Sequence, residues 1–573
     1  MEGQIKIPWL KRVLFSVFIF SIMINMLYLT GSLFMLQVYD RVIPSRNVPT
    51  LTGLIILAVG LYIFQALLDI VRARIFVRVA RAFDRSVSPQ VFDLLVALSL
   101  VSPRVGDGLQ PIRDVATIRG FLAGGGPMVL FDLPWLPFFL ALCFLFHFLI
   151  GLTATIGACV LVMIAIASEI LTRGPVKQSG VFNSRQLGLA GAAYRNAEAL
   201  ASMGMTKAMR ERWLAANDEL IASQSYGSDV AGGLSAVSKA FRFLLQSAVL
   251  AVGAYLVINQ QATAGIIIAS SVLTARALAP AELVIGQWKG AVAARQSWVR
   301  LRTLMKARPD REMRLALPAP TATLDVEELA VRAPGSPKPR VNGVRFKLKA
   351  GEAVGIIGPS GSGKSSLARA LAGVWRPANG AVRLDGAPVH HWDSERLGVH
   401  IGYLPQDVEL FAGTIADNIG RLEAPLDSAA VIQAARAAGV HDLILQFEAG
   451  YETEVGDQGS LLSKGQRQRI ALARALYREP FLVIMDEPNS NLDQEGDEAL
   501  TDAILGVKAR GGIVVVVAHR PNVINAVEHV LVMLDGRMQA FGPKDDVLKR
   551  VIARAPLRAA STKTVSAPNP VTD

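Results

Sequence analysis

Residues 353–371, AVGIIGPSGSGKSSLARAL, place glycines, hydroxyls and a lysine at a spacing that suits phosphate binding. The pattern GxxxxGK followed by Ser or Thr falls on Gly358, Gly363, Lys364 and Ser365. Glycines let backbone N–H groups close around phosphates, and a helix that begins at the loop adds its dipole. Lys364 would reach the β- and γ-phosphates of ATP, and the Ser365 hydroxyl would bind Mg²⁺. The expected nucleotide contacts are Gly358, Pro359, Ser360, Gly361, Ser362, Gly363, Lys364, Ser365 and Ser366.

A second apolar run, FLVIMDEP at residues 481–488, ends in two carboxylates. It predicts a buried strand with both carboxylates at its end. Asp486 would hold Mg²⁺ through a water molecule, and Glu487 would act as the general base on the attacking water. Acidic residues also end strands without any chemical role. A phosphate-binding loop in the same chain favours the chemical interpretation.

Two further polar residues follow apolar stretches. GIVVVVAHR, at residues 512–520, predicts a strand that delivers His519 to its carboxyl end, where open α/β sheets bind ligands. We therefore expect His519 to contact the γ-phosphate. Gln406, in GYLPQDVELF, would sense Mg²⁺ and the attacking water. The expected metal ligands are Ser365, Gln406 and Asp486, and the expected catalytic residues are Glu487, His519 and Gln406.

The stretch LLSKGQRQR, at residues 461–469, lies before the acidic strand, and SNLD, at residues 490–493, follows it. The order phosphate loop, LPQ, LSKGQ, IMDEP, SNLD and AH, within residues 321–545, resembles the ATP-binding-cassette (ABC) family. The resemblance implies an α/β P-loop nucleotide-binding domain that works as a homodimer with two shared ATP molecules. It assigns Asp493 to a contact with the partner. It also implies that one subunit caps the γ-phosphate of the other through Ser463, Lys464, Gly465 and Gln466.

The chain departs from the family pattern at two places. Lys464 replaces the usual glycine of the signature, whereas Gly465, which allows close approach, is retained. A cation beside a triphosphate is electrostatically acceptable, so we interpret Lys464 as a tuning variant; the alternative is a side chain that points to solvent. The aromatic residue that usually stacks on adenine is absent, because Ala333 stands near its expected position. Base selectivity is expected to be loose.

The composition points to a membrane protein. The chain has 573 residues, of which 51% are hydrophobic and 18% charged, with a net charge of +12. Basic loops on the cytoplasmic side of a membrane explain that charge better than nucleic-acid binding does. Cys143 and Cys159 both lie in apolar sequence and form neither a disulfide framework nor a metal-binding spacing.

Long uncharged runs in the first half predict six membrane-spanning helices, since one span needs about 20 apolar residues. Two of the runs are long enough for a pair of spans each, and NQQATAG at residues 259–265 separates one such pair. The segments 71–131 and 170–240 are polar, rich in arginine and helical in pattern, so we expect them to extend the helices into the cytoplasm. The uncharged runs cover residues 13–39, 47–68, 133–168 and 243–275.

The predicted fold class is an all-α six-helix transmembrane domain, of the ABC exporter type, fused to an α/β P-loop ABC nucleotide-binding domain. We place the transmembrane domain at residues 1–304, a charged and then proline-rich linker at 305–320, the ATP-binding domain at 321–550 and a disordered tail at 551–573. An even number of spans puts both termini on one side of the membrane, and the ATP-binding domain fixes that side as cytoplasmic.

Three stretches of the first half look like type I secretion ABC transporters, the exporters of proteases and haemolysins. They are LYLTGSLFMLQVYDRVIPSRNVPTL (27–51), IRDVATIRGFLAGGGPMVLFDLPWLPFFL (112–140) and ARALAPAELVIGQW (275–288). The resemblance implies an unfolded polypeptide substrate with a C-terminal signal. It also implies a periplasmic membrane-fusion adaptor, an outer-membrane channel and a place among the lipids of the inner membrane. Few residues precede the first helix, so we expect no leader-cleaving domain.

Alternatives remain open at this point. The cassette motifs fit an exporter of lipid or small amphipathic molecules equally well. A non-hydrolysing, ATP-gated channel would explain Lys464 and the missing aromatic, although Glu487 and His519 argue against it. The FDLPWLP segment fits helix packing as well as a functional role.

Overall fold

The computed structural model describes residues 10–101, 108–306, 317–518 and 521–554. The chain divides near residue 308 into two compact units, a helical membrane unit and a nucleotide unit that contains both β-sheets. Among the described residues six helical segments are long and apolar enough to cross a membrane, which confirms the predicted number of spans.

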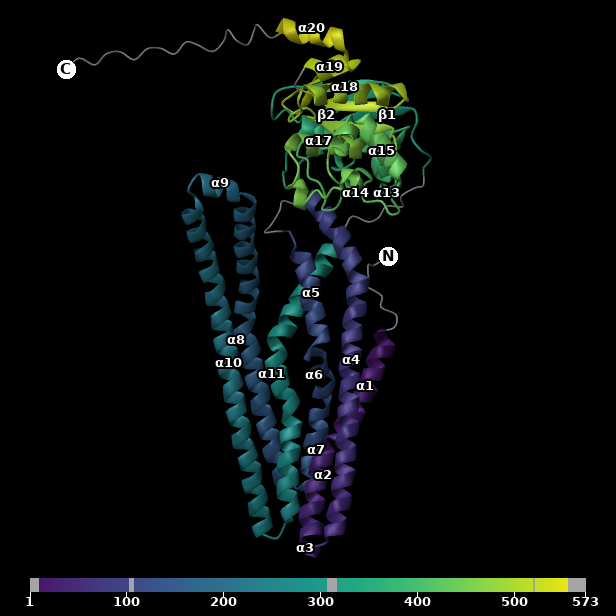
Figure 1. Cartoon of the computed structure of the whole chain (residues 1–573). Helices are drawn as coiled ribbons and strands as arrows, with labels where there is room; N and C mark the ends of the chain where they lie inside the picture. The colour runs from purple at the N-terminus through teal and green to yellow at the C-terminus, as the bar shows by residue number, and fades with distance from the viewer. Residues whose placement is uncertain (1–9, 102–107, 307–316, 519–520, 555–573) are drawn as a thin grey trace, which may run out of the picture. The chain divides into compact units, whose positions relative to one another are not determined.

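The first three spans are formed by interrupted helices and one very long helix (Figure 1). The first span includes α1 and α2, and the third breaks at a short 3-10 turn that contains Pro134, with Pro137 in the first turn of the helix that follows. The bounds are α1 Leu10–Leu27, α2 Leu29–Gln37, η1 Val38–Val42, α3 Ile43–Ser45, α4 Val48–Val101, α5 Gln110–Ala123, α6 Gly126–Asp132, η2 Leu133–Trp135 and α7 Leu136–Phe146.

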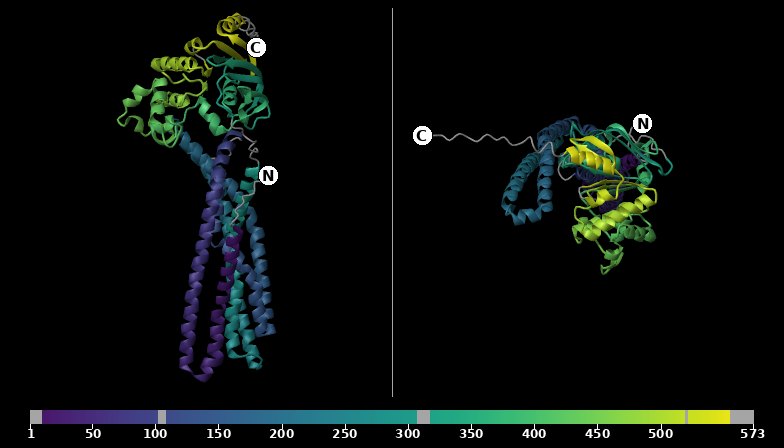
Figure 2. Two further views of the ribbon diagram at one scale, coloured as in Figure 1. Left: turned by 90° about the vertical axis from the view of Figure 1, so that its right-hand side faces the viewer. Right: turned by 90° about the horizontal axis from the view of Figure 1, so that it is seen from above.

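The remaining spans belong to α8, Phe148–Arg195, α10, Thr206–Ile258, and α11, Ala264–Lys306. Helices α8 and α10 run side by side as a hairpin closed by the short α9, Ala197–Ser202, and Figure 2 shows the same pairing from other sides. At about 1.5 Å per residue, the 53 residues of α10 reach about 80 Å, far beyond the roughly 30 Å of hydrocarbon. Helices of this length would continue well outside the membrane, and the cytoplasmic location of these extensions stays a prediction.

Small residues let the spans of the membrane unit pack closely, as is usual for helices in lipid. A Cβ atom added at Gly157 of α8 would lie 2.0 Å from a methyl group of Leu245 on α10, so only glycine fits there. Phe139, Ile150 and Val249 are fully buried beside this contact.

A buried polar cluster joins α1, α4 and α6 around Asp132. Its Oδ1 atom accepts from Ser21 Oγ at 2.8 Å, Asn25 Nδ2 at 3.2 Å and Arg72 Nη1 at 2.7 Å. The second terminal nitrogen of Arg72 pairs with Asp69 at 3.0 Å. Arg72 is 4% exposed and Asp132 8% exposed. The acidic residue of FDLPWLP thus has a packing role.

The nucleotide unit contains two sheets. A four-stranded antiparallel sheet has the order β2-β1-β4-β5, and a six-stranded sheet has the order β10-β9-β3-β8-β7-β6, in which only the edge strand β10 is antiparallel. The strands are β1 Thr323–Arg332, β2 Pro339–Lys349, β3 Ala353–Ile357, β4 Pro377–Leu384, β5 Ala387–Pro388, β6 Ile401–Leu404, β7 Leu482–Asp486, β8 Ile513–Val517, β9 His529–Leu534 and β10 Arg537–Pro543.

Helices cover both faces of the six-stranded sheet. Strands β7 and β8 are buried throughout, and this explains their unbroken apolar sequences. Along β7, Leu482 and Ile484 face the core shared with the smaller sheet, whereas Val483 and Met485 face the core of the helical side. The helices are α12 Lys364–Leu371, α13 Ser394–His400, α14 Ile415–Ile419, α15 Ser428–Ala437, α16 His441–Leu445, α17 Lys464–Leu476, α18 Gln494–Ala509, α19 Pro521–Asn525 and α20 Lys544–Arg554, with 3-10 turns η3 Val389–His391, η4 Gly450–Glu452 and η5 Asp457–Gly459.

Candidate ATP site

The phosphate loop joins the end of β3 to the start of α12, and its backbone conformation requires glycine at several positions. Gly358, Gly361 and Gly363 have φ angles of 152°, 80° and 96°, in the region that other residues rarely adopt. A Cβ atom at Gly358 would also lie 2.2 Å from the carbonyl oxygen of Met533. The loop can therefore follow this path only with glycine at these positions.

Lys364 is the first residue of α12, and its side chain folds back over the loop. The amine donates to the carbonyl oxygens of Gly358 and Pro359, both at 2.9 Å, and the residue is only 4% exposed. Burial lowers the pKa of Lys364, while the carboxylates of Glu487 and Asp486 act in the opposite direction. The structure thus places a poorly solvated cation at the loop that would surround the phosphates.

Asp486 ends β7 next to the same helix and is fully buried. Ser365 Oγ donates to Asp486 Oδ1 at 3.1 Å, whereas Oδ2 has no hydrogen-bond partner among the described residues. Burial raises the pKa of Asp486, and the Ser365 hydrogen bond opposes this. A hydroxyl and a buried carboxylate with an unused oxygen are oxygen ligands of the kind that Mg²⁺ prefers, so the residues fit the ion.

Glu487 leaves the strand in a left-handed conformation, with a φ angle of 53°, which is unusual for a residue other than glycine. Its backbone N–H donates to Val517 O at 3.2 Å, which ties it to the end of β8. Gln406, in the loop after β6, donates through Nε2 to Glu487 Oε2 at 3.0 Å. The structure therefore brings together Gln406 and Glu487, which lie 81 residues apart in the chain.

The signature LSKGQ lies at the N-terminus of α17. Ser463 is the N-cap: its hydroxyl accepts from Gln466 N at 3.2 Å, and Gln466 Oε1 accepts from Ser463 N at 2.9 Å. Lys464 is the first helical residue and its side chain is exposed. A Cβ atom at Gly465 would lie 3.0 Å from Asn491 O, so a larger residue would crowd the turn after β7.

Asp493 caps α18 within its own subunit. Its Oδ1 accepts from Gly496 N at 2.9 Å and also binds Arg469 of α17. The Gly496 N–H and then the Arg469 guanidinium lower the pKa of Asp493. Its contact with a partner stays a prediction.

Other predicted residues have different outcomes. His519 lies outside the described residues. Ala333 follows β1 directly, at the start of the loop to β2, and is half-buried.

Sequence reasoning missed Gln468, which is 3% exposed and contacts the turn that carries Glu487. Its only signal was a polar residue on the side of α17 that otherwise carries core residues.

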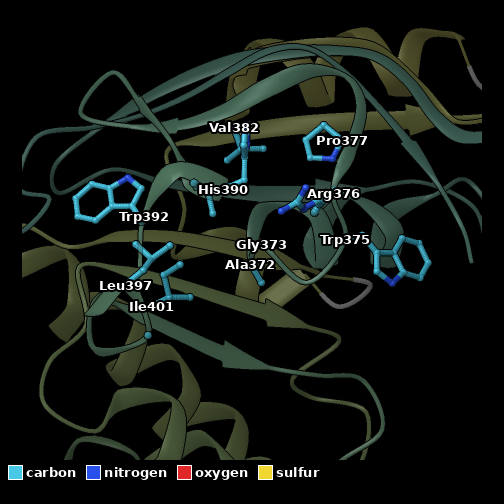
Figure 3. A pocket seen from close by; sticks show the side chains of 13 residues that line it. Ala372, Gly373, Trp375, Arg376, Pro377, Val382, His390, Trp392, Leu397 and Ile401 are labelled. Carbon is cyan, nitrogen blue, oxygen red and sulfur yellow. The ribbon is translucent and has the colours of Figure 1, made fainter. Parts of the chain in front are cut away.

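A separate cavity of about 240 Å³ lies beside the end of α12, β4 and α13 (Figure 3). Trp375, Trp392 and Leu397 line it, with His390 and Arg376 among the polar members. None of the predicted site residues lines this cavity, so it is distinct from the phosphate loop.

Comparisons with known proteins identify the family of the chain. Residues 341–490 match the ABC transporter family, and residues 14–279 match the ABC transporter transmembrane region. The chain is 53% identical to the type I secretion system ATP-binding protein PrsD of Rhizobium meliloti (strain 1021) over 532 residues, which cover 93% of this chain and 91% of that relative. The chain belongs to the type I secretion ABC transporters.

The chain is also similar to proteins of lower sequence identity. The exotoxin translocation ATP-binding protein PaxB of Pasteurella aerogenes is 28% identical over 94% of the chain and 76% of its own length. A solved bacterial Atm1-family ABC exporter with ATP bound matches with a TM-score of 0.83 at 23% identity, covering 98% of this chain and all of that one. That structure supports the fold alone. The family and the site together make the chain an ATPase coupled to transport.

Proposed function

We propose that this transporter uses ATP to drive an unfolded polypeptide with a C-terminal signal across the inner membrane of a Gram-negative bacterium. The observation that carries the proposal is the similarity to a type I secretion ATP-binding protein over both units of the chain. An exporter of lipid would share the cassette, but the membrane unit is part of this match as well.

Each site residue has a role that follows from its contacts. Lys364 would exchange the two loop carbonyls for the β- and γ-phosphates, which are stronger acceptors because they are charged. Ser365 and Asp486 would hold Mg²⁺, with Gln406 nearby, and the ion would neutralise charge on the triphosphate. Glu487, oriented by Gln406, would take the proton of the attacking water. His519 would contact the γ-phosphate.

The functional transporter would be a dimer of two copies of the chain. The described part of one copy has six helical segments that could span a membrane and one nucleotide unit. Ser463 and Lys464 are exposed at the start of a 13-residue helix, where free backbone N–H groups and the helix dipole favour a phosphate. We propose that they cap the ATP of the partner subunit and that Asp493 contributes to the same interface.

The environment follows from the same proposal. Exposed apolar side chains on the spans, such as Ile56 (69% exposed) and Leu57 (59% exposed), would contact membrane lipid. The nucleotide unit would lie in the cytoplasm, where ATP is. A periplasmic membrane-fusion adaptor and an outer-membrane channel would carry the polypeptide onward, and nucleic acid has no part.

The substitution Glu487→Gln tests the ATPase part of the proposal. The variant should bind ATP with the affinity of the unaltered protein and lose steady-state hydrolysis, because the amide cannot accept the proton of water. The assay is phosphate release by the full chain in lipid nanodiscs. Glu448→Gln, at an exposed position outside the site, is the matched control and should hydrolyse normally. Unchanged hydrolysis by Glu487→Gln would refute the assignment of the base.

A further inference from the structure

The turn after β7 holds the proposed base in a conformation that its own sequence does not favour. Glu487 has positive φ, and residues 487–491 make a tight turn in which Ser490 N donates to Glu487 O at 3.4 Å. Positive φ in a residue other than glycine persists only where the surroundings fix it. The contacts that hold this turn therefore decide where the carboxylate points.

Gln468 of α17 supplies those contacts. Its Nε2 donates to Pro488 O and, at 3.4 Å, to Glu487 O, while its Oε1 accepts from Asn491 N at 3.2 Å. The residue is 3% exposed. A side-chain amide has one acceptor and one NH₂ group, and here both are directed at the same turn.

The neighbouring residue strengthens this attachment. Arg469 is 5% exposed and binds Asp493, which begins α18 immediately after the turn. The helix α17 thus holds the segment between β7 and α18 at two consecutive points. No residue of the turn itself contributes an equivalent contact to the carbonyl of Pro488 among the described residues.

We propose that Gln468 is a positioning residue for ATP hydrolysis: it fixes the turn at Glu487 so that the carboxylate meets Gln406 and the attacking water. In this role Gln468 would act through Glu487 and would not itself contact the nucleotide. The inference rests on the proposed role of Glu487 as the base. Since Ser463 caps the N-terminus of α17, a movement of this helix would reach Glu487 through Gln468.

The test replaces Gln468 by methionine, which has a similar volume and cannot form the three contacts. In the full chain in nanodiscs, Gln468→Met should lower kcat about tenfold to a hundredfold, the effect of a displaced catalytic group. The KM for ATP and the ATP dissociation constant should not change, because the phosphate loop is untouched. Ile470→Val, fully buried on the same helix, is the matched control and should retain kcat.

A double variant shows whether the loss passes through the base. In a single-turnover assay, Gln468→Met combined with Glu487→Gln should react at the rate of Glu487→Gln alone, since a misplaced base cannot be lost twice. A further drop by the same factor would overturn the inference, and so would an unchanged kcat in Gln468→Met or an equal loss in Ile470→Val. If Gln468→Met does not fold, Gln468→Asn, which keeps the amide but is shorter, gives the same comparison.

The two proposals can fail separately. Full hydrolysis by Glu487→Gln would remove the base assignment, and the positioning role with it. Loss of hydrolysis in Glu487→Gln together with normal kcat in Gln468→Met would overturn only the role of Gln468.

Discussion

The polar cluster of the membrane unit allows a stability prediction with a definite magnitude. Replacing Asp132 by leucine removes three hydrogen bonds and leaves Arg72, which is 4% exposed, without its closest counter-charge. Breaking a buried ion pair from one side typically costs 3–5 kcal/mol. Arg72 keeps its pair with the less buried Asp69, so we expect about 3 kcal/mol, the lower end of that range.

The measurement is equilibrium unfolding of the full chain in mixed detergent micelles, followed by intrinsic fluorescence. Asp84→Asn is the control, because the Asp84–Arg119 pair is 30% and 51% exposed, and such a pair contributes about 1 kcal/mol or less. Replacing both partners, as Asp132→Leu with Arg72→Met, should recover most of the loss, since no deeply buried charge then remains unpaired; Asp69, which loses Arg72, has a side chain that is 35% exposed.

Two results would refute this reasoning. Equal losses of unfolding free energy in Asp132→Leu and Asp84→Asn would mean that burial does not make the loss of the Asp132–Arg72 pair more costly. A double variant as unstable as the sum of the single ones would mean that the residues act independently and the cluster is not one unit.

Three further predictions concern the nucleotide site. Ala333→Tyr should tighten ATP binding about tenfold, because stacking of an aromatic ring on a base contributes about 1–3 kcal/mol. If a fluorescence titration gives the same ATP affinity for Ala333→Tyr and the unaltered chain, residue 333 is not where the ring would stack. ATP affinity should fall as pH rises toward 10.5, since burial lowers the pKa of Lys364 and phosphates bind its charged form; the decline should disappear in Lys364→Met. Chelation of Mg²⁺ should abolish hydrolysis, and Asp486→Asn should require more Mg²⁺ for half-maximal ATP binding; an unchanged Mg²⁺ requirement would exclude Asp486 as a ligand.

Much of the fold could be predicted because it depends on local patterns. Uncharged runs that are long enough, as helices, to cross the hydrocarbon core of a bilayer predict spans by length alone, and Figure 1 shows the resulting helices. The phosphate loop could be found because its glycines, lysine and serine act within eight consecutive residues, from Gly358 to Ser365. Strand β7 could be found because a strand buried on both faces is apolar throughout.

The rest depends on contacts between distant parts of the chain, which local patterns do not contain. Asp132 meets Arg72 across 60 residues, so FDLPWLP allowed a packing role but did not indicate its ion-pair partner. Gln468 reaches Pro488 across 20 residues, and nothing in the sequence of the turn indicates that a helix holds it. The positive φ of Glu487 is likewise a feature that the sequence of the turn does not indicate.

The central claim is the export of polypeptide, and the most direct measurement compares proteins in the culture medium of the native host. Strains should express either the unaltered chain or Glu487→Gln at equal levels. We predict that one or a few polypeptides disappear from the medium of the Glu487→Gln strain and accumulate, uncleaved, inside the cells. An unchanged medium, with the variant present in the membrane and inactive in hydrolysis, would contradict polypeptide export.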